Sequence, residues 1–457
     1  MKVVMSVAGS DSSGGAGVQA DLRTFAALGV YGAAVVTSVT AQNSEGVRCR
    51  RDMSPELVRA QIEAVVEDIG VDFTKTGMLA SSAIVECVAE VLHRYNIPFV
   101  LDPVLEAGAG GKLLDEDALP TLIERLLPLA VVTTPNVAEA SIISGIDVKD
   151  EKSLREAALR IHELGVEAVV ITGGHFERKG IDLLYDGEFL ELQSYVVQTD
   201  GQIHGAGCTF SAALAAELAK GQSLREAAVT AKKFVTAAIS GGARTQRIGK
   251  RKMVVADQLF TLRKAESKLE AIENVKAAVR MLQRNKSFIE LIPEVGTNVG
   301  MAAVHAENSA DVAAVCGRIR KCGDEIKAGC VELGASEHIA RAILAAMGIN
   351  AEIRAAMNVR LSQEILGVCQ QLHLDLASFS RAEEPAGVKT LDWGVRDAAR
   401  RWLASQPEPR TRKFPDAIYD WGAEGKEPML RLFGRNAVEV ARKALMISEK
   451  LVQLESM

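Results

Sequence analysis

The stretch SLREAALRIHELGVEAVVITGG, residues 153–174, contains one complete helix-to-strand unit. In its first part, SLREAALRIHELG, apolar residues recur at helical spacing, and Gly165 is a typical helix stop. EAVVITGG then joins a short β-branched apolar run to a glycine turn, as a buried strand does. This order predicts an α/β fold around the stretch.

Five more runs in the first half of the chain have the same character. They are KVVMSVAG (2–9), GAAVVTSVTA (32–41), DFTKTGM (72–78), PFVLDPV (98–104) and AVVTTPN (130–136). Helical patterns such as SPELVRAQIEAVVEDIG (54–70) lie between runs of this kind. The alternation predicts a mostly parallel sheet flanked by helices, with ligands bound at the carboxyl ends of the strands.

Length and composition narrow the class of protein. A chain of 457 residues is too long for one ordinary core, and 48% hydrophobic with 25% charged residues is typical of a globular protein. The net charge of -6 gives no overall attraction to nucleic acid or phospholipid. The seven cysteines form no CxxC pair, and no apolar run reaches membrane-spanning length. We therefore expect a cytoplasmic protein with reduced thiols and no nucleic-acid or membrane partner.

The composition changes after about residue 245. The segment 246–275 is basic and helix-prone, which predicts a helical linker between a first domain at 1–245 and a second at 276–457. The second domain has its own apolar strand candidates, namely FIELIPEVGTNVGMAA (288–303), ADVAAVCGRI (310–319) and EIRAAMNVR (352–360). They predict a separate α/β core.

The stretch IHGAGCTFSAALAAELAKG, residues 203–221, runs from a glycine turn into a helix. Free N–H groups and the macrodipole at a helix start favour an anion. This predicts a phosphate-binding turn at Gly205, Ala206 and Gly207, followed by Cys208. A tight loop with a packed cysteine is the alternative interpretation.

Residues 7–47, VAGSDSSGGAGVQADLRTFAALGVYGAAVVTSVTAQNSEGV, resemble the hydroxymethylpyrimidine and phosphomethylpyrimidine kinases of thiamine biosynthesis, in the ribokinase-like superfamily. The resemblance continues in TKTGML (74–79), LDPV (101–104), TPNVAEA (134–140), TGGH (172–175) and HGAGCTFSAA (204–213). It implies a ribokinase-like fold, Mg²⁺, and ATP-dependent phosphorylation of 4-amino-5-hydroxymethyl-2-methylpyrimidine and of its monophosphate. It also implies a homo-oligomer.

The same resemblance implies contacts to the pyrimidine. Asp21 and Gln42 match the polar contacts, Met78 matches the apolar wall, and Gly9 matches the position where the ring approaches the backbone. A carboxylate and an amide suit a ring that offers donors and acceptors. Core packing or a helix cap is the alternative for each side chain.

Four other positions match the phosphate and metal apparatus. Asp102 and Glu139 are the implied Mg²⁺ residues, and Asn136 is an implied nucleotide or phosphate contact. An Asn-x-x-Glu pattern also occurs at ordinary helix starts. His204 is either a contact that steers the loop or a phosphate, or an ordinary loop histidine.

Cys208 stands where related sugar kinases carry an aspartate base. The thiol is either a base that takes the substrate's hydroxyl proton, which we favour, or a group that positions the hydroxyl. Thr172 stands where many relatives carry lysine, so a cationic phosphate contact is missing or is supplied elsewhere.

The second domain resembles the thiamine-phosphate synthase domain fused to this kinase in archaea and some bacteria. The matching stretches are IPEVGTNVGMA (292–302), DVAAVCGRI (311–319), GASEHIARAIL (334–344), IRAAMNVR (353–360) and PDAIYDWGAEGKEPMLRLFG (415–434). The resemblance implies coupling of hydroxymethylpyrimidine diphosphate to thiazole phosphate with release of diphosphate.

Arg318 and His338 are the catalytic candidates of this domain, because the departing diphosphate needs a cation and a hydrogen-bond donor. A surface ion pair and a packing histidine are the alternatives. Weaker candidates are Asn358, Arg360, Asp420 and Lys426. The alternative function is a kinase whose C-terminal domain only senses thiamine phosphate; the presence of Arg318 and His338 favours the enzyme.

Overall fold

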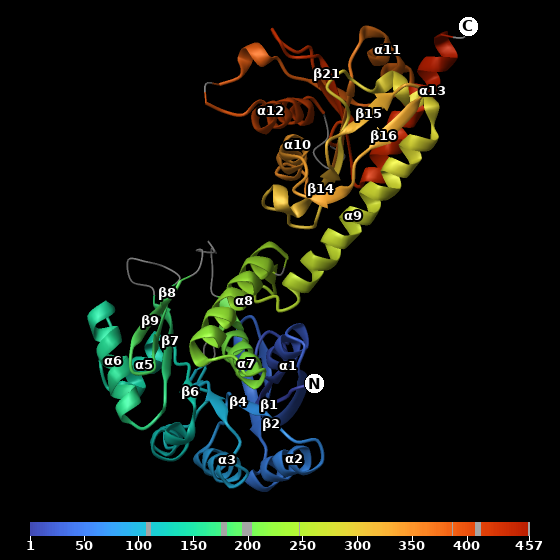
Figure 1. The fold of residues 1–457 in the computed structure, drawn as a ribbon. Coiled ribbons are helices and arrows are strands. Elements are labelled where there is room, and N and C mark those ends of the chain that lie inside the picture. Colours follow the sequence, from blue (N-terminus) through green and yellow to red (C-terminus); the bar gives the residue numbers. More distant parts are fainter. Residues whose placement is uncertain are drawn as a thin grey trace. The chain divides into compact units, whose positions relative to one another are not determined.

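The computed structural model describes residues 1–106, 111–174, 181–193, 203–245, 247–385, 387–406 and 413–455. The chain divides into two compact units, Met1–Leu262 and Arg263–Met457 (Figure 1). Each unit has its own sheets and its own apolar clusters. Among the described residues, no helix combines the length and the apolar character needed to cross a membrane.

The first unit is built on a nine-stranded sheet in the order β3-β2-β1-β4-β5-β6-β7-β8-β9. The strands are β1 (Val3–Asp11), β2 (Tyr31–Asn43), β3 (Gly46–Asp52), β4 (Phe73–Thr76), β5 (Phe99–Leu101), β6 (Val132–Thr133), β7 (Val169–Gly174), β8 (Ile181–Tyr185) and β9 (Phe189–Leu192). Strands β2 to β7 in this order pair in parallel, whereas β3, β8 and β9 pair antiparallel. The predicted mostly parallel sheet is confirmed, and each of the six predicted runs forms one of its strands.

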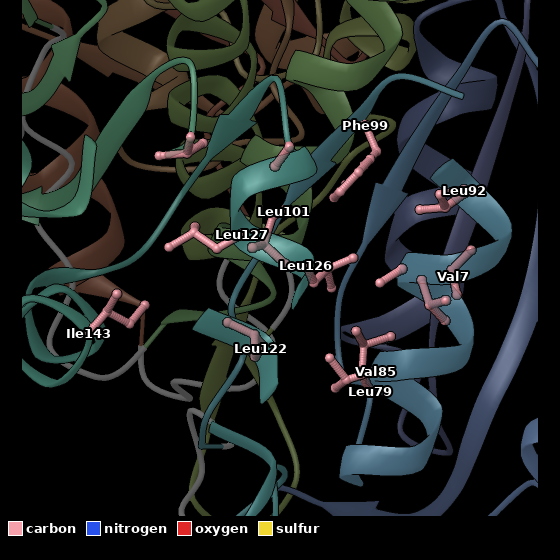
Figure 2. Close-up of a cluster of buried hydrophobic side chains, with 14 of the residues drawn as sticks. Val7, Leu79, Val85, Leu92, Phe99, Leu101, Leu122, Leu126, Leu127 and Ile143 are labelled. Atoms are coloured by element: carbon pink, nitrogen blue, oxygen red, sulfur yellow. The ribbon is translucent and has the colours of Figure 1, made fainter. Parts of the chain in front are cut away.

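Helices cover both faces of this sheet (Figure 1). On one face Val4 and its neighbours pack against α1 (Gly17–Ala27), α7 (Ala206–Ala219) and α8 (Leu224–Thr245). On the other face Val7 packs in a cluster with α2 (Pro55–Asp68), α3 (Ser82–Arg94), α5 (Val137–Ser144) and α6 (Glu151–Glu163). Figure 2 shows part of this cluster, including Val7, Leu92 and Phe99. Alternate residues of a strand face opposite layers, which explains the division.

The helix-to-strand unit at 153–174 folds for local reasons. Asp150 caps α6 by accepting a hydrogen bond from the Ser153 N–H at 2.8 Å. Gly165 follows the helix with a φ of 110°, a conformation that favours glycine. The chain then enters β7, whose Val169 and Ile171 are fully buried. Residues 175–180, which include the last residue of the TGGH motif, lie outside the described residues.

The segment 246–275 is not helical throughout. Residue 246 lies outside the described residues, and β11 (Arg247–Ile248) and β12 (Met253–Val255) follow it. These strands form a small sheet with β10 (Ile203–His204), in the order β10-β12-β11. Helix α9 (Phe260–Arg284) then begins, and the division between the two units falls between Leu262 and Arg263.

The second unit contains a seven-stranded sheet in the order β17-β14-β13-β18-β21-β20-β19. The strands are β13 (Val299–Ala302), β14 (Val312–Val315), β17 (Val331–Leu333), β18 (Ala355–Arg360), β19 (Leu376–Ser378), β20 (Ala417–Asp420) and β21 (Met429–Gly434). Among the described residues of this sheet, only β19 and β20 pair in parallel. A hairpin of β15 (Ile319–Cys322) and β16 (Glu325–Ala328) follows β14.

Helices also cover both faces of the second sheet. Helices α9, α11 (Gln363–Gln371) and α13 (Ala437–Glu455) pack on one face, and α10 (Glu337–Met347) and α12 (Thr390–Ser405) pack on the other. The predicted separate α/β core is confirmed. The expected strand at residues 288–291 is wrong, because Lys286–Leu291 forms a 3₁₀ helix. Asn285 caps this helix, and the strand begins only at Val299.

Candidate active sites

A cavity of about 260 Å³ lies at the carboxyl ends of the parallel strands of the first unit. Its wall includes Gly9 from β1, Met78 after β4, Asp102 after β5 and Thr172 from β7. The wall also contains these predicted site residues: Gln42, Asn136, Glu139, His204, Gly205, Ala206, Gly207 and Cys208. The topology thus brings residues from six separate motifs to one place, as expected for a parallel sheet.

Two glycine-rich turns interlock beside this cavity. Gly205 has a φ of 80°, and a Cβ there would lie 1.9 Å from the carbonyl oxygen of Gly15. His204 Nε2 lies 2.9 Å from the Asp11 carboxylate, and this carboxylate also accepts from the N–H of Ser13 at 2.8 Å. Although burial opposes the shift, these hydrogen bonds lower the pKa of Asp11 to about 2. His204 therefore joins the start of α7 to the turn before α1.

The apolar wall of the cavity depends on a close contact between Gly9 and Met78. A Cβ on Gly9 would lie 2.8 Å from the Met78 sulfur, so there is room for hydrogen only. Gln42 lines the same cavity, with its side-chain nitrogen 3.5 Å from His204 Nε2. An amide beside a thioether wall suits a flat ring with polar edges.

Lys75 and Asp21 form a buried ion pair behind the wall. Lys75 Nζ lies 3.0 Å from Asp21 Oδ2 and 3.6 Å from Asp102 Oδ2. Burial opposes the charged form of the ammonium, but the charges of Asp21 and Asp102 raise its pKa above the usual range. Lys75 lines the cavity and Asp21 is not among the lining residues. The structure therefore does not support the predicted contact between Asp21 and the pyrimidine, because the carboxylate is occupied by Lys75 and by the Ser6 hydroxyl at 2.6 Å.

Cys208 lies in the first turn of α7, on the cavity wall. Burial raises the pKa of its thiol to about 12, although the charge of Lys75 acts in the opposite direction. One turn further, the Ser211 hydroxyl donates to Asp102 Oδ2 at 2.8 Å. The start of α7 thus presents free backbone N–H groups and a protonated thiol to the cavity.

Asn136 and Glu139 form a capping box at the start of α5. Asn136 Oδ1 accepts from the Glu139 N–H at 2.9 Å, and Glu139 Oε2 accepts from the Asn136 N–H at 2.9 Å. Burial and the charge of Asp102 raise the pKa of Glu139 to about 8, against the backbone N–H groups of Asn136 and Leu105. The ordinary helix-start interpretation therefore holds locally, and the two carboxyl groups also share one cavity wall.

The second unit has a cavity of about 540 Å³ on the sheet face covered by α10 and α12. Arg318 lies in the turn between β14 and β15, and His338 lies in the first turn of α10. Both line this cavity, together with Asn358 and Lys426. The two catalytic candidates are therefore brought together with two of the weaker ones.

The backbone holds Arg318 in an unusual conformation. Its φ is 74°, after Gly317 with a φ of 68°. The guanidinium donates to the Val295 carbonyl at 2.6 Å. Desolvation lowers the pKa of His338, and so do the charges of Arg431, Arg318, Arg341 and Arg381. His338 is therefore in the range of four guanidinium groups, which is a suitable surrounding for an anion.

Two weaker candidates do not reach the cavity wall. Arg360 donates from Nε to the Glu290 carbonyl at 3.0 Å, and it is absent from the lining residues. Asp420 is buried behind the wall and pairs with Arg381 and Arg431, which do line the cavity. Sequence reasoning missed Lys75, Arg381 and Arg431. Arg431 carries a recognisable signal, because it is a charged residue in the otherwise apolar strand β21, whereas Lys75 lies between two threonines in β4.

The fold and the first cavity define a ribokinase-like small-molecule kinase. Among solved structures, the ADP complex of Bacillus subtilis pyridoxal kinase is similar with a TM-score of 0.52 and 40% sequence identity, covering 57% of this chain and 99% of that chain. The hydroxymethylpyrimidine/phosphomethylpyrimidine kinase of Rhizobium meliloti is 46% identical over 247 residues, which are 53% of this chain and 92% of that protein.

The second unit extends the similarity to the whole chain. The bifunctional thiamine biosynthesis protein ThiDN of Methanocaldococcus jannaschii is 32% identical over 450 residues, covering 98% of each chain. Residues 11–256 match the family phosphomethylpyrimidine kinase, and residues 274–446 match thiamine-phosphate synthase ThiN. The chain belongs to the phosphomethylpyrimidine kinase family, in the branch that carries a ThiN synthase unit.

This membership decides between the two functions considered from the sequence. The chain is a bifunctional enzyme of thiamine biosynthesis, with a hydroxymethylpyrimidine/phosphomethylpyrimidine kinase unit and a thiamine-phosphate synthase unit. ATP is the co-substrate that the kinase family implies. The sensor alternative is not favoured.

Proposed function

We propose that the cavity of the first unit binds 4-amino-5-hydroxymethyl-2-methylpyrimidine, and then its monophosphate, with the reacting oxygen at the start of α7. The observation that carries this proposal is the shared cavity wall of Gln42, Met78, Lys75 and Cys208. It combines a flat apolar wall, an amide, a buried cation and a helix start. A phosphoryl-transfer site for a small heteroaromatic alcohol needs these parts.

In this proposal, recognition of the ring falls to Gln42 and Met78. The Gln42 amide offers a donor and an acceptor to the polar edge of the pyrimidine, and Met78 covers the apolar face. Gly9 lets the ring lie against the backbone, because it has no Cβ. A Cβ at this position would displace the Met78 sulfur. Asp21 acts indirectly, by holding Lys75 at the wall.

The transferring phosphoryl group is placed at Gly205, Ala206 and Gly207. Their N–H groups belong to the first turn of α7, where the macrodipole favours negative charge. Lys75 supplies a fixed positive charge on the same wall, so a cation is present although Thr172 replaces the usual lysine. Together these groups stabilise charge that develops on the phosphoryl oxygens.

Cys208 positions the substrate hydroxyl in our proposal and does not act as the base. A thiol with a pKa near 12 is protonated at neutral pH, so it donates a hydrogen bond far better than it accepts a proton. The loose transition state of phosphoryl transfer makes early removal of the hydroxyl proton unnecessary. This changes our preference from the sequence, where the base was favoured.

Asp102 and Glu139 are the residues that would hold Mg²⁺. They fit a hard cation, because two carboxyl groups lie on one wall and the charge of Asp102 contributes to the high pKa of Glu139. The ion that these carboxyl groups would hold would offset negative charge on the phosphates of ATP. Ser211 orients Asp102 through its 2.8 Å hydrogen bond.

The cavity of the second unit is where we place the coupling of the pyrimidine diphosphate to thiazole phosphate. Arg318 binds oxygens of the leaving diphosphate, and His338 donates a hydrogen bond to it. The cationic surroundings of His338, to which Arg318 contributes, support this assignment, since negative charge accumulates on the departing group.

The whole proposal is tested by one incubation. The full chain is supplied with hydroxymethylpyrimidine, thiazole phosphate, ATP and Mg²⁺, and thiamine phosphate is followed by mass spectrometry. We expect the wild-type chain to form thiamine phosphate. The chain carrying Lys75→Met should form thiamine phosphate only when pyrimidine diphosphate is supplied. Absence of thiamine phosphate with the folded wild-type chain contradicts the proposal.

Two further assignments remain predictions. We propose that kinase activity belongs to residues 1–245 and synthase activity to residues 276–457, with 246–275 between them. We also propose a homo-oligomer in the cytoplasm. Light scattering on the full chain measures the oligomeric state, and a single-chain mass contradicts that part.

A further inference from the structure

A buried carboxylate lies behind the wall of the second cavity. The Asp420 side chain is fully buried, at 0% exposed, and it accepts from Arg381 Nε at 2.5 Å and from Arg431 Nη1 at 2.7 Å. The Gly422 N–H also donates to Asp420 Oδ1, at 2.9 Å. Arg381 and Arg431 line the cavity, whereas Asp420 is not among its lining residues. One carboxylate therefore fixes two guanidinium groups on the wall.

The wall of this cavity has an excess of positive charge. Its described charged residues are six cations and two carboxylates: Arg318, Arg341, Arg381, Lys389, Lys426 and Arg431 against Glu384 and Glu427. The carboxylates have other partners, since Glu384 accepts from the Thr390 hydroxyl and Glu427 from the Glu294 N–H. Arg431 is only 4% exposed. A buried guanidinium is costly unless an anion pairs with it, and Asp420 supplies that anion for Arg431.

The cations come from two separate parts of the sheet. Arg318 follows β14, whereas Arg431 lies in β21, and the strand order places β13 and β18 between them. Three steps between neighbouring strands correspond to roughly 14 Å. Arg381 joins Arg431 through Asp420, at the β21 side. The cavity thus has one cationic group near β14 and another near β21.

Each arginine of the second group keeps donors for a ligand. A guanidinium carries five N–H donors. Arg381 uses Nε and one Nη2 contact at 3.5 Å on Asp420. Arg431 uses Nη1 on Asp420 and on the Met429 carbonyl. The remaining donors of two fixed guanidinium groups suit the tetrahedral oxygens of a phosphate ester.

We propose that Arg381 and Arg431 form a phosphate subsite on the β21 side of the cavity, apart from Arg318 on the β14 side, that Asp420 is its positioning residue, and that it binds the phosphate of the thiazole substrate. The proposal rests on the synthase function proposed above. The coupling brings two anionic substrates into one cavity, and the leaving diphosphate takes the group near β14. The second anion then needs donors of its own, and the pair at β21 supplies them.

The test measures steady-state synthesis by the full chain while each substrate is varied at saturation of the other. Arg381→Ala should raise KM for thiazole phosphate by about 10- to 100-fold, the effect of losing a hydrogen bond to a charged group. KM for pyrimidine diphosphate should stay within about threefold. Arg381→Lys keeps the positive charge but loses the bidentate geometry of the guanidinium. Its KM for thiazole phosphate should therefore lie between those of the wild-type chain and of Arg381→Ala. Asp420→Asn should resemble Arg381→Ala in KM, because both arginines lose their fixed orientation.

A second measurement uses the thiazole alcohol, which lacks the phosphate. The wild-type chain should prefer the phosphate strongly, and Arg381→Ala should lose most of this preference. Arg435→Ala is the matched control, because Arg435 is an exposed arginine paired with Glu352. Calorimetric unfolding of each variant reports whether the second unit is intact, because kinase turnover depends on the first unit alone.

Four outcomes contradict the subsite or the synthase function separately. A rise in KM for pyrimidine diphosphate alone assigns Arg381 to the diphosphate and overturns the subsite. An unchanged preference for the phosphate over the alcohol also overturns it. If the folded wild-type chain makes no thiamine phosphate, the proposed synthase function fails. Calorimetric titration with thiazole phosphate and with the alcohol then decides the subsite alone, and equal affinity for the two overturns it.

Discussion

Lys75 Nζ lies 3.0 Å from Asp21 Oδ2, and neither side chain is exposed to solvent. The pair fixes the ammonium beneath the cavity wall, where it also lies 3.6 Å from Asp102. An ammonium in this place is held by the protein before any substrate arrives. The site therefore does not have to collect a flexible cation during the reaction.

Replacement of one member of this pair should cost more than replacement of both. Lys75→Met leaves Asp21 buried without its cation, which typically destabilises a protein by about 3–5 kcal/mol. Adding Asp21→Asn removes the stranded charge and should recover a large part of the loss. Calorimetry of the full chain measures this as a shift of one unfolding transition. Purely additive losses would show that the two charges do not interact.

Cys208 gives a prediction about pH. Because its pKa is near 12, the thiol stays protonated up to about pH 10. Kinase turnover should therefore not rise with pH between 7 and 9 through this group. A thiolate base would instead increase the rate about tenfold for each pH unit in this range. Kinase turnover is measured for the wild-type chain and for Cys208→Ala between pH 7 and 9. If Cys208 is a base, turnover rises with pH in the wild-type chain and not in the alanine variant; if it is a positioning group, neither shows a rise through this residue.

The contact between Gly9 and Met78 predicts a paired effect. In Gly9→Ala the new Cβ meets the Met78 sulfur at 2.8 Å, so the methionine must move into the cavity or the backbone must shift. We expect KM for hydroxymethylpyrimidine to rise by about tenfold or more. Adding Met78→Ala removes the clash and should lower KM again. Gly29→Ala is a control for the extra methyl group at a site with open space, where the φ of 72° adds backbone strain.

Arg318 and His338 should affect synthesis only. Each change to Ala is expected to lower thiamine-phosphate formation from supplied pyrimidine diphosphate by about 10²-fold, the scale of one preorganised donor. Kinase turnover should stay intact, because the two cavities belong to units with separate cores. Synthesis that survives both changes would leave the function and remove the proposed residues.

The parallel sheet of the first unit could be predicted because most of its strands lie in short, largely apolar runs that end in a turn. Residues such as Met78, Asp102 and Thr172 follow or end these strands, so their meeting at one edge follows from the topology. The family resemblance implied the contact between Asp21 and the substrate, and a carboxylate suits the ring. Its partner Lys75 lies 54 positions away, and no local pattern joins the two.

The second unit was less accessible from sequence. Its sheet is largely antiparallel, and the strand order separates β14 from β21 in a way that apolar runs do not encode. Arg318 and His338 were found from their motifs. Arg381 was missed because it lies in a short 3₁₀ helix, Arg381–Glu383, outside every quoted stretch. Its importance depends on Asp420, which meets it only through the fold.

The left-handed backbone of Arg318 has a consequence for variation at this position. A φ of 74° is strained for every side chain except glycine, and nearly free of cost for glycine. Arginine at 318 thus lowers stability, a cost that its proposed contact with the diphosphate would explain. A survey of all substitutions at 318 should rank glycine highest for the abundance of folded protein and near the bottom for thiamine-phosphate formation. A design guided by stability alone would therefore raise the stability of the protein and remove its synthase activity.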